Sequence, residues 1–244
     1  MTREQASAFL TAMRNSPAAY ERRHYPLFLL LARTGARLGE ALALRWDDAD
    51  FSAHELRIAR ALSGGRFETP KSGHGRTVDM SEQLTKSLLR LRLDRKTETL
   101  KHGWPNLPEW IFCTETGTLL DESRVRKVMR KVLKAAGLPL HFSPHCLRHT
   151  FASLLLQQGE SPAYVQRQLG HASIQLTVDT YGKWLPMGNK AAVNRLDDAS
   201  GSKVVAPSKS GTPGDPEMPD SNGGPSRTRT LDPLIKSQLL SQLS

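Results

Sequence analysis

The stretch SPHCLRHTFAS, residues 143–153, combines a strong helix start with two basic side chains. Ser143 followed by Pro144 is typical of a helix N-terminus, because serine caps the first turn and proline there loses no hydrogen bond. His145 and Arg148 are three residues apart and therefore lie on one face of the predicted helix. Because a helix N-terminus attracts anions, the pair indicates a phosphate site. The alternative is an ordinary surface histidine and surface arginine.

The same stretch raises the alternative of a metal site, since His141, His145 and His149 are spaced four residues apart. Pro144 places His141 before the helix, which leaves two candidate ligands with no acidic residue nearby. The two cysteines of the chain also lack the spacing of a zinc site. The sequence therefore favours a site without a metal ion.

A second segment, TGARLGEALALRW at residues 34–46, places Arg37 after a glycine break. Arg37 opens a predicted helix whose apolar positions face inward, so its side chain is held well enough to form two hydrogen bonds to a phosphate. Glu40, one turn later, is placed to orient the guanidinium. The alternative is an exposed ion pair between the two side chains.

A third segment, LGHASIQLTVDTYGKW at residues 169–184, has His171 after a glycine and Tyr181 ten residues later. A lone tyrosine usually packs in a core. Where cationic groups stabilise the developing charge, however, a tyrosine can attack phosphorus as a nucleophile. Tyr181 is therefore a candidate nucleophile, with core packing as the alternative.

The predicted fold class is α+β, mainly α, with a small antiparallel sheet. Thr2 followed by Gln5 predicts a capping box at the first helix. Between residues 55 and 80, the segments ELRIARAL, GGRFETP and GRTVDM predict two or three short antiparallel strands with a turn at Lys71–Gly75. The sequence predicts helices over residues 2–15, 20–33, 37–44, 81–101, 121–136, 143–157, 161–169 and 174–184.

Charge and composition divide the chain near residue 199. The 34 Lys and Arg residues exceed the 24 Asp and Glu residues, and of the resulting net charge of +10 only +1 lies in residues 199–244. A basic chain favours a polyanionic partner such as nucleic acid. Residues 199–225, rich in Pro, Gly and Ser, predict a disordered linker, and leucines at helical spacing predict a short helix within residues 226–244.

The sequence indicates neither a membrane span nor a signal peptide. Its longest apolar stretch, PLFLLLA at residues 26–32, is far shorter than the roughly 20 residues needed to cross a bilayer. The start, MTREQASAF, has no apolar region of the kind that a signal peptide requires. We therefore expect a cytoplasmic protein without a membrane partner.

Four phrases, TGARLGEALALRW, TPKSGHGRTV, PHCLRHTFAS and LGHASIQLTVDTYG, resemble in this order the motifs of the tyrosine recombinase family, the phage-type integrases. The resemblance covers residues 1–198 and implies the catalytic fold of that family. It implies a site-specific DNA recombinase that cuts through a 3′-phosphotyrosyl bond and uses no metal and no other cofactor. It further implies double-stranded DNA as the partner, a homotetramer on that DNA, and accessory DNA-bending or directionality proteins.

The resemblance also assigns the proton transfers of this reaction. Tyr181 matches the nucleophile, and His145 matches the general base that takes its proton. Lys71 matches the turn lysine that protonates the leaving 5′-oxygen, a role that requires neighbouring cations to lower its pKa.

Three further residues match positions that bind the phosphate, and a fourth matches a supporting position. Arg37 and Arg148 match the two arginines that clamp it. His171 matches a residue that hydrogen-bonds a non-bridging oxygen, and Glu40 matches an acid that supports the site without reacting. These cations would stabilise the transition state in place of a metal ion.

One departure from the family pattern concerns the start of the chain. Family members carry a helical DNA-clamping domain ahead of the catalytic domain, whereas residues 2–10 resemble the first catalytic-domain helix. We therefore expect the clamp domain to be absent, through a natural short form or a truncation. The remaining candidate DNA contacts form a basic run: Arg124, Arg126, Lys127, Arg130 and Lys131. The alternative is that this run is an ordinary solvated helix face.

The expected role is integration or excision of a prophage or an integrative element. Residues 224–244 resemble peptides made when an integrase reading frame runs into an attachment site in a transfer-RNA gene. Residues 184–196 could form a helix that docks on a neighbouring protomer. Two alternatives stay open: the same chemistry in an Xer-like chromosome-dimer resolvase or a tyrosine topoisomerase, and a catalytically silent DNA-binding remnant.

Overall fold

The computed structural model describes residues 1–69, 75–185, 188 and 193. Lys71, the expected linker over 199–225 and the expected helix within 226–244 lie outside the described residues, as does most of the expected docking helix over 184–196. The other candidate site residues and the expected DNA contacts all lie within the described part of the chain.

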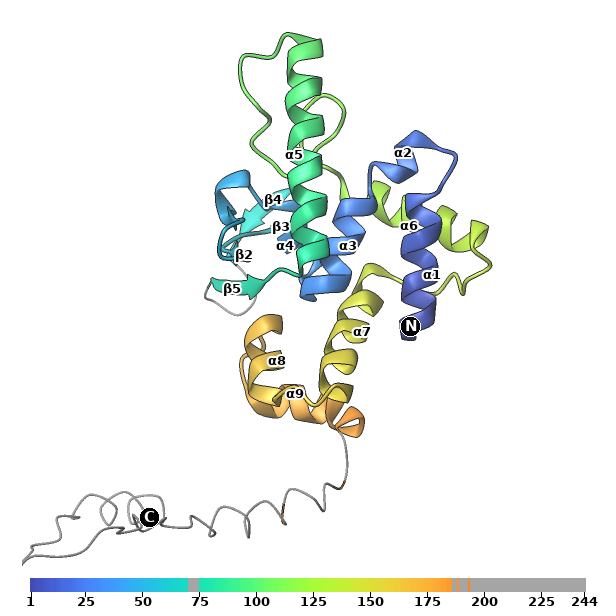
Figure 1. Cartoon of the computed structure of the whole chain (residues 1–244), viewed down its shortest axis with the longest axis vertical. Helices are drawn as coiled ribbons and strands as arrows, with labels where there is room; N and C mark the ends of the chain where they lie inside the picture. The colour runs from blue at the N-terminus through green and yellow to red at the C-terminus, as the bar shows by residue number, and fades with distance from the viewer. Residues whose placement is uncertain (70–74, 186–187, 189–192, 194–244) are drawn as a thin grey trace, which may run out of the picture. The chain divides into compact units, whose positions relative to one another are not determined.

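Helices dominate the described part of the chain, and the small antiparallel sheet is present, so the predicted fold class is confirmed (Figure 1). Short 3-10 turns lie at Trp46–Asp48 and Gly182–Trp184. The α-helices are α1 (Arg3–Arg14), α2 (Ala19–Arg22), α3 (Tyr25–Thr34), α4 (Leu38–Leu42), α5 (Glu82–His102), α6 (Glu122–Ala135), α7 (Pro144–Gln157), α8 (Pro162–Leu169) and α9 (Ile174–Tyr181).

The strands form one three-stranded sheet and one hairpin, both antiparallel. The sheet has the order β1-β2-β5, with β1 at Ala49–Asp50, β2 at Glu55–Ile58 and β5 at Arg76–Asp79. The hairpin pairs β3 (Ala61–Ser63) with β4 (Arg66–Glu68). The chain thus forms more strands than predicted, because residues 61–68 fold into a hairpin of their own instead of extending the sheet.

The predicted helix over residues 20–33 is two helices. Pro26 lies in the first turn of α3, and proline has no N–H to donate to the carbonyl of Arg22. The chain therefore leaves α2 after Arg22 and restarts at Tyr25. The predicted start of α1 is confirmed, since Thr2 and Gln5 form the reciprocal bonds of a capping box.

Two apolar clusters hold these elements together. The larger one is centred on α3, whose residues Leu27–Leu31 are fully buried, and it joins α3 to α1, α5, α6 and the sheet. The smaller one contains residues from α7, α8 and α9: Ala152, Leu156, Val165, Leu169 and Tyr181. In Figure 1, α8 and α9 lie together beside α7, which contributes residues to both clusters.

Gly35 marks the point where the two clusters meet. It ends α3 with a φ of +64°, and a side chain there would come within 2.5 Å of Phe151 and 2.8 Å of Leu169. Only glycine fits such a backbone at such close approach without strain. The turn at Gly35 then leads directly into the N-terminus of α4.

We predict that Gly35→Ala destabilises the protein more than Gly103→Ala. Gly103 ends α5 with nearly the same φ, +65°, but a side chain there would meet nothing within 4 Å. Gly103→Ala should cost about 1 kcal/mol from backbone strain alone, whereas Gly35→Ala adds overpacking of roughly 1–3 kcal/mol. Urea unfolding of the two variants measures the difference, and equal losses of stability would contradict the packing of Gly35.

Candidate active site

A buried carboxylate, that of Glu40, lies between two arginines. Arg37 caps α4, and its backbone N–H and side chain donate to the Glu40 carboxylate at 2.8 and 2.9 Å. Arg76, at the start of β5, donates to both carboxylate oxygens at 3.0 and 2.8 Å. Burial would raise the pKa of Glu40, but the hydrogen bonds and charges of Arg76 and Arg37 outweigh it, so the pKa is lowered and the group is ionised.

Arg148, a third arginine, is 2% exposed and lies close enough for the charges of Arg37, Glu40 and Arg76 to act on it. It rises from α7, and its two terminal nitrogens donate to the carbonyls of Gly35 and Leu169 at 2.6 and 2.7 Å. Burial and then the charge of Arg37 lower the pKa of Arg148 to about 10, which leaves the group cationic at neutral pH. Each terminal nitrogen carries a second N–H, so the fixed guanidinium can still donate to a ligand.

Tyr181, at the end of α9, is 3% exposed and lies between two histidines. Its hydroxyl shares a 2.8 Å hydrogen bond with Nδ1 of His149, and its ring stacks on that of His171 at 6.2 Å between centroids. Nδ1 of His171 is bonded in turn to Oγ1 of Thr177, which is fully buried, at 2.8 Å. Burial raises the pKa of Tyr181, although the charge of Arg148 opposes this, so the phenol is protonated.

The histidines of the site are neutral at neutral pH. Burial, followed by the charges of Arg148, Arg37 and Arg76, lowers the pKa of His171 to about 4. Burial and Arg148 lower the pKa of His149, with a further contribution from the amino terminus. The pKa of His145 is lowered by burial and then by His149 and Arg148, and its ring meets that of His149 edge to face at 4.6 Å. A neutral imidazole can accept a proton.

The predicted site residues within the described part of the chain therefore come together from distant parts of the sequence. Hydrogen bonds, ring contacts and mutual charge effects join them into one network. Its predicted members are Arg37, Glu40, His145, Arg148, His171 and Tyr181. Lys71 lies outside the described residues. A cleft of about 370 Å³ beside the network is lined by Arg37, His145 and Arg126 among others.

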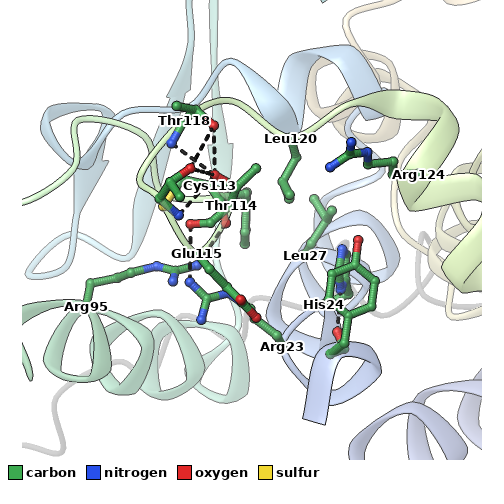
Figure 2. Close-up of a pocket in the computed structure, with 13 residues that line it drawn as sticks. Arg23, His24, Leu27, Arg95, Cys113, Thr114, Glu115, Thr118, Leu120 and Arg124 are labelled. Carbon is green, nitrogen blue, oxygen red and sulfur yellow. Dashed lines mark hydrogen bonds between the residues drawn. The ribbon is translucent and has the colours of Figure 1, made fainter. Parts of the chain in front are cut away.

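Two of the five predicted DNA contacts on α6 line different pockets. All five basic side chains are exposed, opposite the buried face of α6. Arg126 lines the cleft at Arg37, where it is also paired with Glu122 at 2.7 Å. Arg124 instead lines a second pocket, of about 300 Å³, together with Arg23 and Arg95, and this pocket shares no lining residue with the first (Figure 2).

Two residues of the network escaped the sequence prediction. Arg76 lies within TPKSGHGRTV, but its partner Glu40 is 36 residues away in sequence, so the motif alone indicated no role for it. His149 was predicted only as a weak candidate metal ligand, although it lies four residues after His145 on the same helix face. That spacing is the one signal in the sequence that could have placed His149 beside His145 in the site.

Within the part of the chain that the structure describes, no three His, Cys, Asp or Glu side chains are grouped as metal ligands. Among the same residues, no helix is both long and apolar enough to span a bilayer.

Comparison with known proteins places these features in one family. Residues 1–184 match the Phage integrase family. A tyrosine recombinase XerC-like protein of Caldanaerobacter subterraneus subsp. tengcongensis is 35% identical over 190 residues, which are 70% of this chain and 48% of that protein. The ICEBs1 integrase of Bacillus subtilis is 29% identical over 182 residues, 68% of this chain and 46% of that protein. The chain spans about half the length of such curated relatives.

Solved structures agree on the fold. The Tn1549 transposon integrase in complex with transposon right end DNA superposes with a TM-score of 0.64 at 20% identity, over 83% of this chain and 66% of that one. XerA recombinase superposes with a TM-score of 0.58 at 26% identity, over 83% of this chain and 65% of that one. Since the family match also includes every described residue of the site, the chain belongs to the phage integrase family.

Proposed function

We propose that this protein is a site-specific DNA strand transferase with Tyr181 as the nucleophile. The observation that carries the proposal is the position of the Tyr181 hydroxyl, bonded to His149 within the same network as Arg148 and Arg37. Tyr181 forms a bond to the scissile phosphorus, and the bond from phosphorus to the 5′-oxygen breaks. A 3′-phosphotyrosyl link and a free 5′-hydroxyl result, and a second 5′-hydroxyl reverses the step on another strand.

The proton of Tyr181 passes to the imidazole pair of α7. The resemblance to the family implies His145 as the acceptor, whereas the geometry favours His149, whose Nδ1 is 2.8 Å from the hydroxyl. A neutral His149 with its proton on Nε2 presents the lone pair that accepts it. The leaving 5′-oxygen takes a proton from Lys71, as the family resemblance implies.

The cations of the network stabilise the charge on the phosphorane. Arg37 and Arg148 are anchored by protein groups, so they need no reorganisation when charge develops. Thr177 can donate to Nδ1 of His171, which leaves the proton of this neutral ring on Nε2, free to donate to a non-bridging oxygen. Glu40 does not react, because both its oxygens are occupied by arginines.

Double-stranded DNA is the proposed partner, with the exposed basic face of α6 as a backbone contact beside the cleft. The Tn1549 integrase, described as bound to transposon DNA, and the ICEBs1 integrase support integration or excision of a mobile element as the role. The proposal includes a catalytic domain over residues 1–198, a homotetramer on DNA and accessory proteins. A similar protein of Escherichia coli, named as putative defective protein IntQ, supports the silent remnant as the second candidate.

Incubation with a nicked suicide duplex from the flanking genome should trap a covalent protein–DNA adduct. We predict that Tyr181→Phe abolishes the adduct because it removes the attacking oxygen, while the loss of one hydrogen bond, about 1 kcal/mol, leaves the protein folded. Tyr20→Phe, at an exposed tyrosine, is the matched control and should form the adduct normally. DNA binding without any adduct in the wild type would support the silent remnant.

Arg148→Lys should lower the cleavage rate constant while leaving duplex affinity nearly unchanged. Lysine keeps the positive charge but lacks the planar guanidinium, which can donate to the carbonyls of Gly35 and Leu169 and to a phosphate at the same time. Arg130→Ala on α6 should have the opposite effect. It should weaken duplex binding and reduce the salt dependence of the binding constant by about one counterion, but it should not slow cleavage at saturating DNA. Binding titrations over a salt series and single-turnover cleavage separate the two effects, and identical behaviour of both variants would contradict this division.

The cleavage rate should be constant around pH 7 and fall in acid, because the lowered pKa values of His145 and His149 keep both imidazoles neutral at pH 7. The variant His149→Ala should lose this acid limb and slow cleavage by roughly 100-fold or more. A larger loss in His145→Ala would assign the base to His145. Below pH 6.5, histidines of the unfolded chain bind protons that the folded protein does not bind, so the stability of the fold decreases as the pH falls. Circular dichroism at each pH should therefore confirm that the protein is folded.

A further inference from the structure

The nucleophile and the phosphate-binding arginines rest on different apolar clusters. Tyr181 belongs to the smaller cluster, with residues of α7 and α8. Arg37 lies between Ala36 and Leu38, which are buried in the larger cluster. Helix α7 carries Arg148 and contributes to both clusters, and a further contact outside α7 holds α8 against the elements that carry Arg37 and Arg76.

A buried glutamine in α8, Gln168, makes such a contact with β5. Gln168 is 4% exposed, and both ends of its amide are bonded to Asp79: the oxygen accepts from the backbone N–H at 3.0 Å, and Nε2 donates to Oδ2 at 3.0 Å. Its backbone carbonyl accepts from Nε of Arg76 at 2.9 Å. The last turn of α8 is thus fixed to both ends of β5.

A second side chain of α8 reinforces the same contact. The hydroxyl of Tyr164, one turn before Gln168, donates to Oδ2 of Asp79 at 2.6 Å. Burial and the Asp79 carboxylate raise the pKa of Tyr164, so its hydroxyl keeps the proton that it donates. One carboxylate oxygen therefore accepts from two successive turns of α8.

The contact leads directly to the reacting groups. Arg76 binds the Gln168 carbonyl through Nε and the Glu40 carboxylate through both terminal nitrogens, and Glu40 holds Arg37. In the other direction, Leu169 follows Gln168 and accepts from Arg148. A shift of Gln168 would consequently move α8 against all three arginines at once.

We propose that Gln168, held by Asp79 and Tyr164, is a positioning residue that sets the distance between Tyr181 and the arginines that bind the phosphate. The inference rests on the proposed strand-transfer function. Gln168 touches no reacting atom and acts through the register of α8 against β5.

Gln168→Leu tests the inference, because leucine is of similar volume and removes both side-chain bonds while keeping the backbone bond to Arg76. The single-turnover cleavage rate constant at saturating nicked duplex should fall roughly 10- to 100-fold, as expected for a misplaced reacting group. The dissociation constant for the duplex should stay within about twofold, because the DNA-facing cations are unchanged.

Ser161→Ala is the matched control for a merely structural effect. Ser161 caps α8 by accepting from the Tyr164 N–H at 3.1 Å, so its loss weakens the same helix without touching Asp79 or Gln168. We expect Ser161→Ala to lower the melting temperature at least as much as Gln168→Leu does. It should nevertheless cleave at the wild-type rate. An equal slowing in the two variants would overturn the positioning role.

The conservative variant Asp79→Asn should retain a rate within about threefold of the wild type, because one amide oxygen can accept from both Gln168 and Tyr164. Asp79→Ala should reproduce the loss, and the double variant with Gln168→Leu should be no slower than either single variant. A wild-type adduct with an unchanged rate in Gln168→Leu overturns this inference alone. Absence of a Tyr181-dependent adduct in the wild type overturns the proposed function and the inference with it.

Discussion

The carboxylate of Glu40 has no exposed side-chain surface and lies between the guanidiniums of Arg37 and Arg76. A buried carboxylate is tolerated only when it is paired and fully hydrogen-bonded, and removal of one partner of such a pair costs about 3–5 kcal/mol. These bonds join α4 to β5, and Arg76 carries the connection on to α8. The arrangement of the site depends on this one anion, because it partly compensates cations that would otherwise repel each other.

The repulsion that remains has chemical consequences. Arg148 is buried near Arg37 and Arg76 with backbone carbonyls as its hydrogen-bond partners, and its pKa falls accordingly. Burial, and after it the charge of Arg148, suppress protonation of His145, His149 and His171. The positive field that would bind a phosphate therefore adds to burial in keeping the neighbouring imidazoles neutral, so they can accept a proton.

Local patterns predicted most of this fold, and contacts between distant segments account for what they missed. Capping residues such as Thr2 and Ser143 lie at the starts of α1 and α7, because capping is decided within one turn. The break before Tyr25 was missed although Pro26 signals it, since the surrounding run is uniformly apolar. The roles of Arg76 and Gln168 could not be predicted, because each depends on a partner tens of residues away.

The burial of Tyr181 bears on how a reaction here would be controlled. A side chain that is 3% exposed offers little surface to a duplex, so the proposed attack would be favoured by a shift of α9. Within the part of the chain that the structure describes, the cluster around Tyr181 has few buried members, and a small core opens more readily than a large one. The hydrogen bond to His149 and the raised pKa meanwhile keep the phenol protonated. Arrival of a phosphate would supply an anion for Arg37 and Arg148, which favours arrangements that bring Tyr181 toward them. In the proposed mechanism, the small size of this second cluster would therefore allow Tyr181 to stay protected until a substrate is in place.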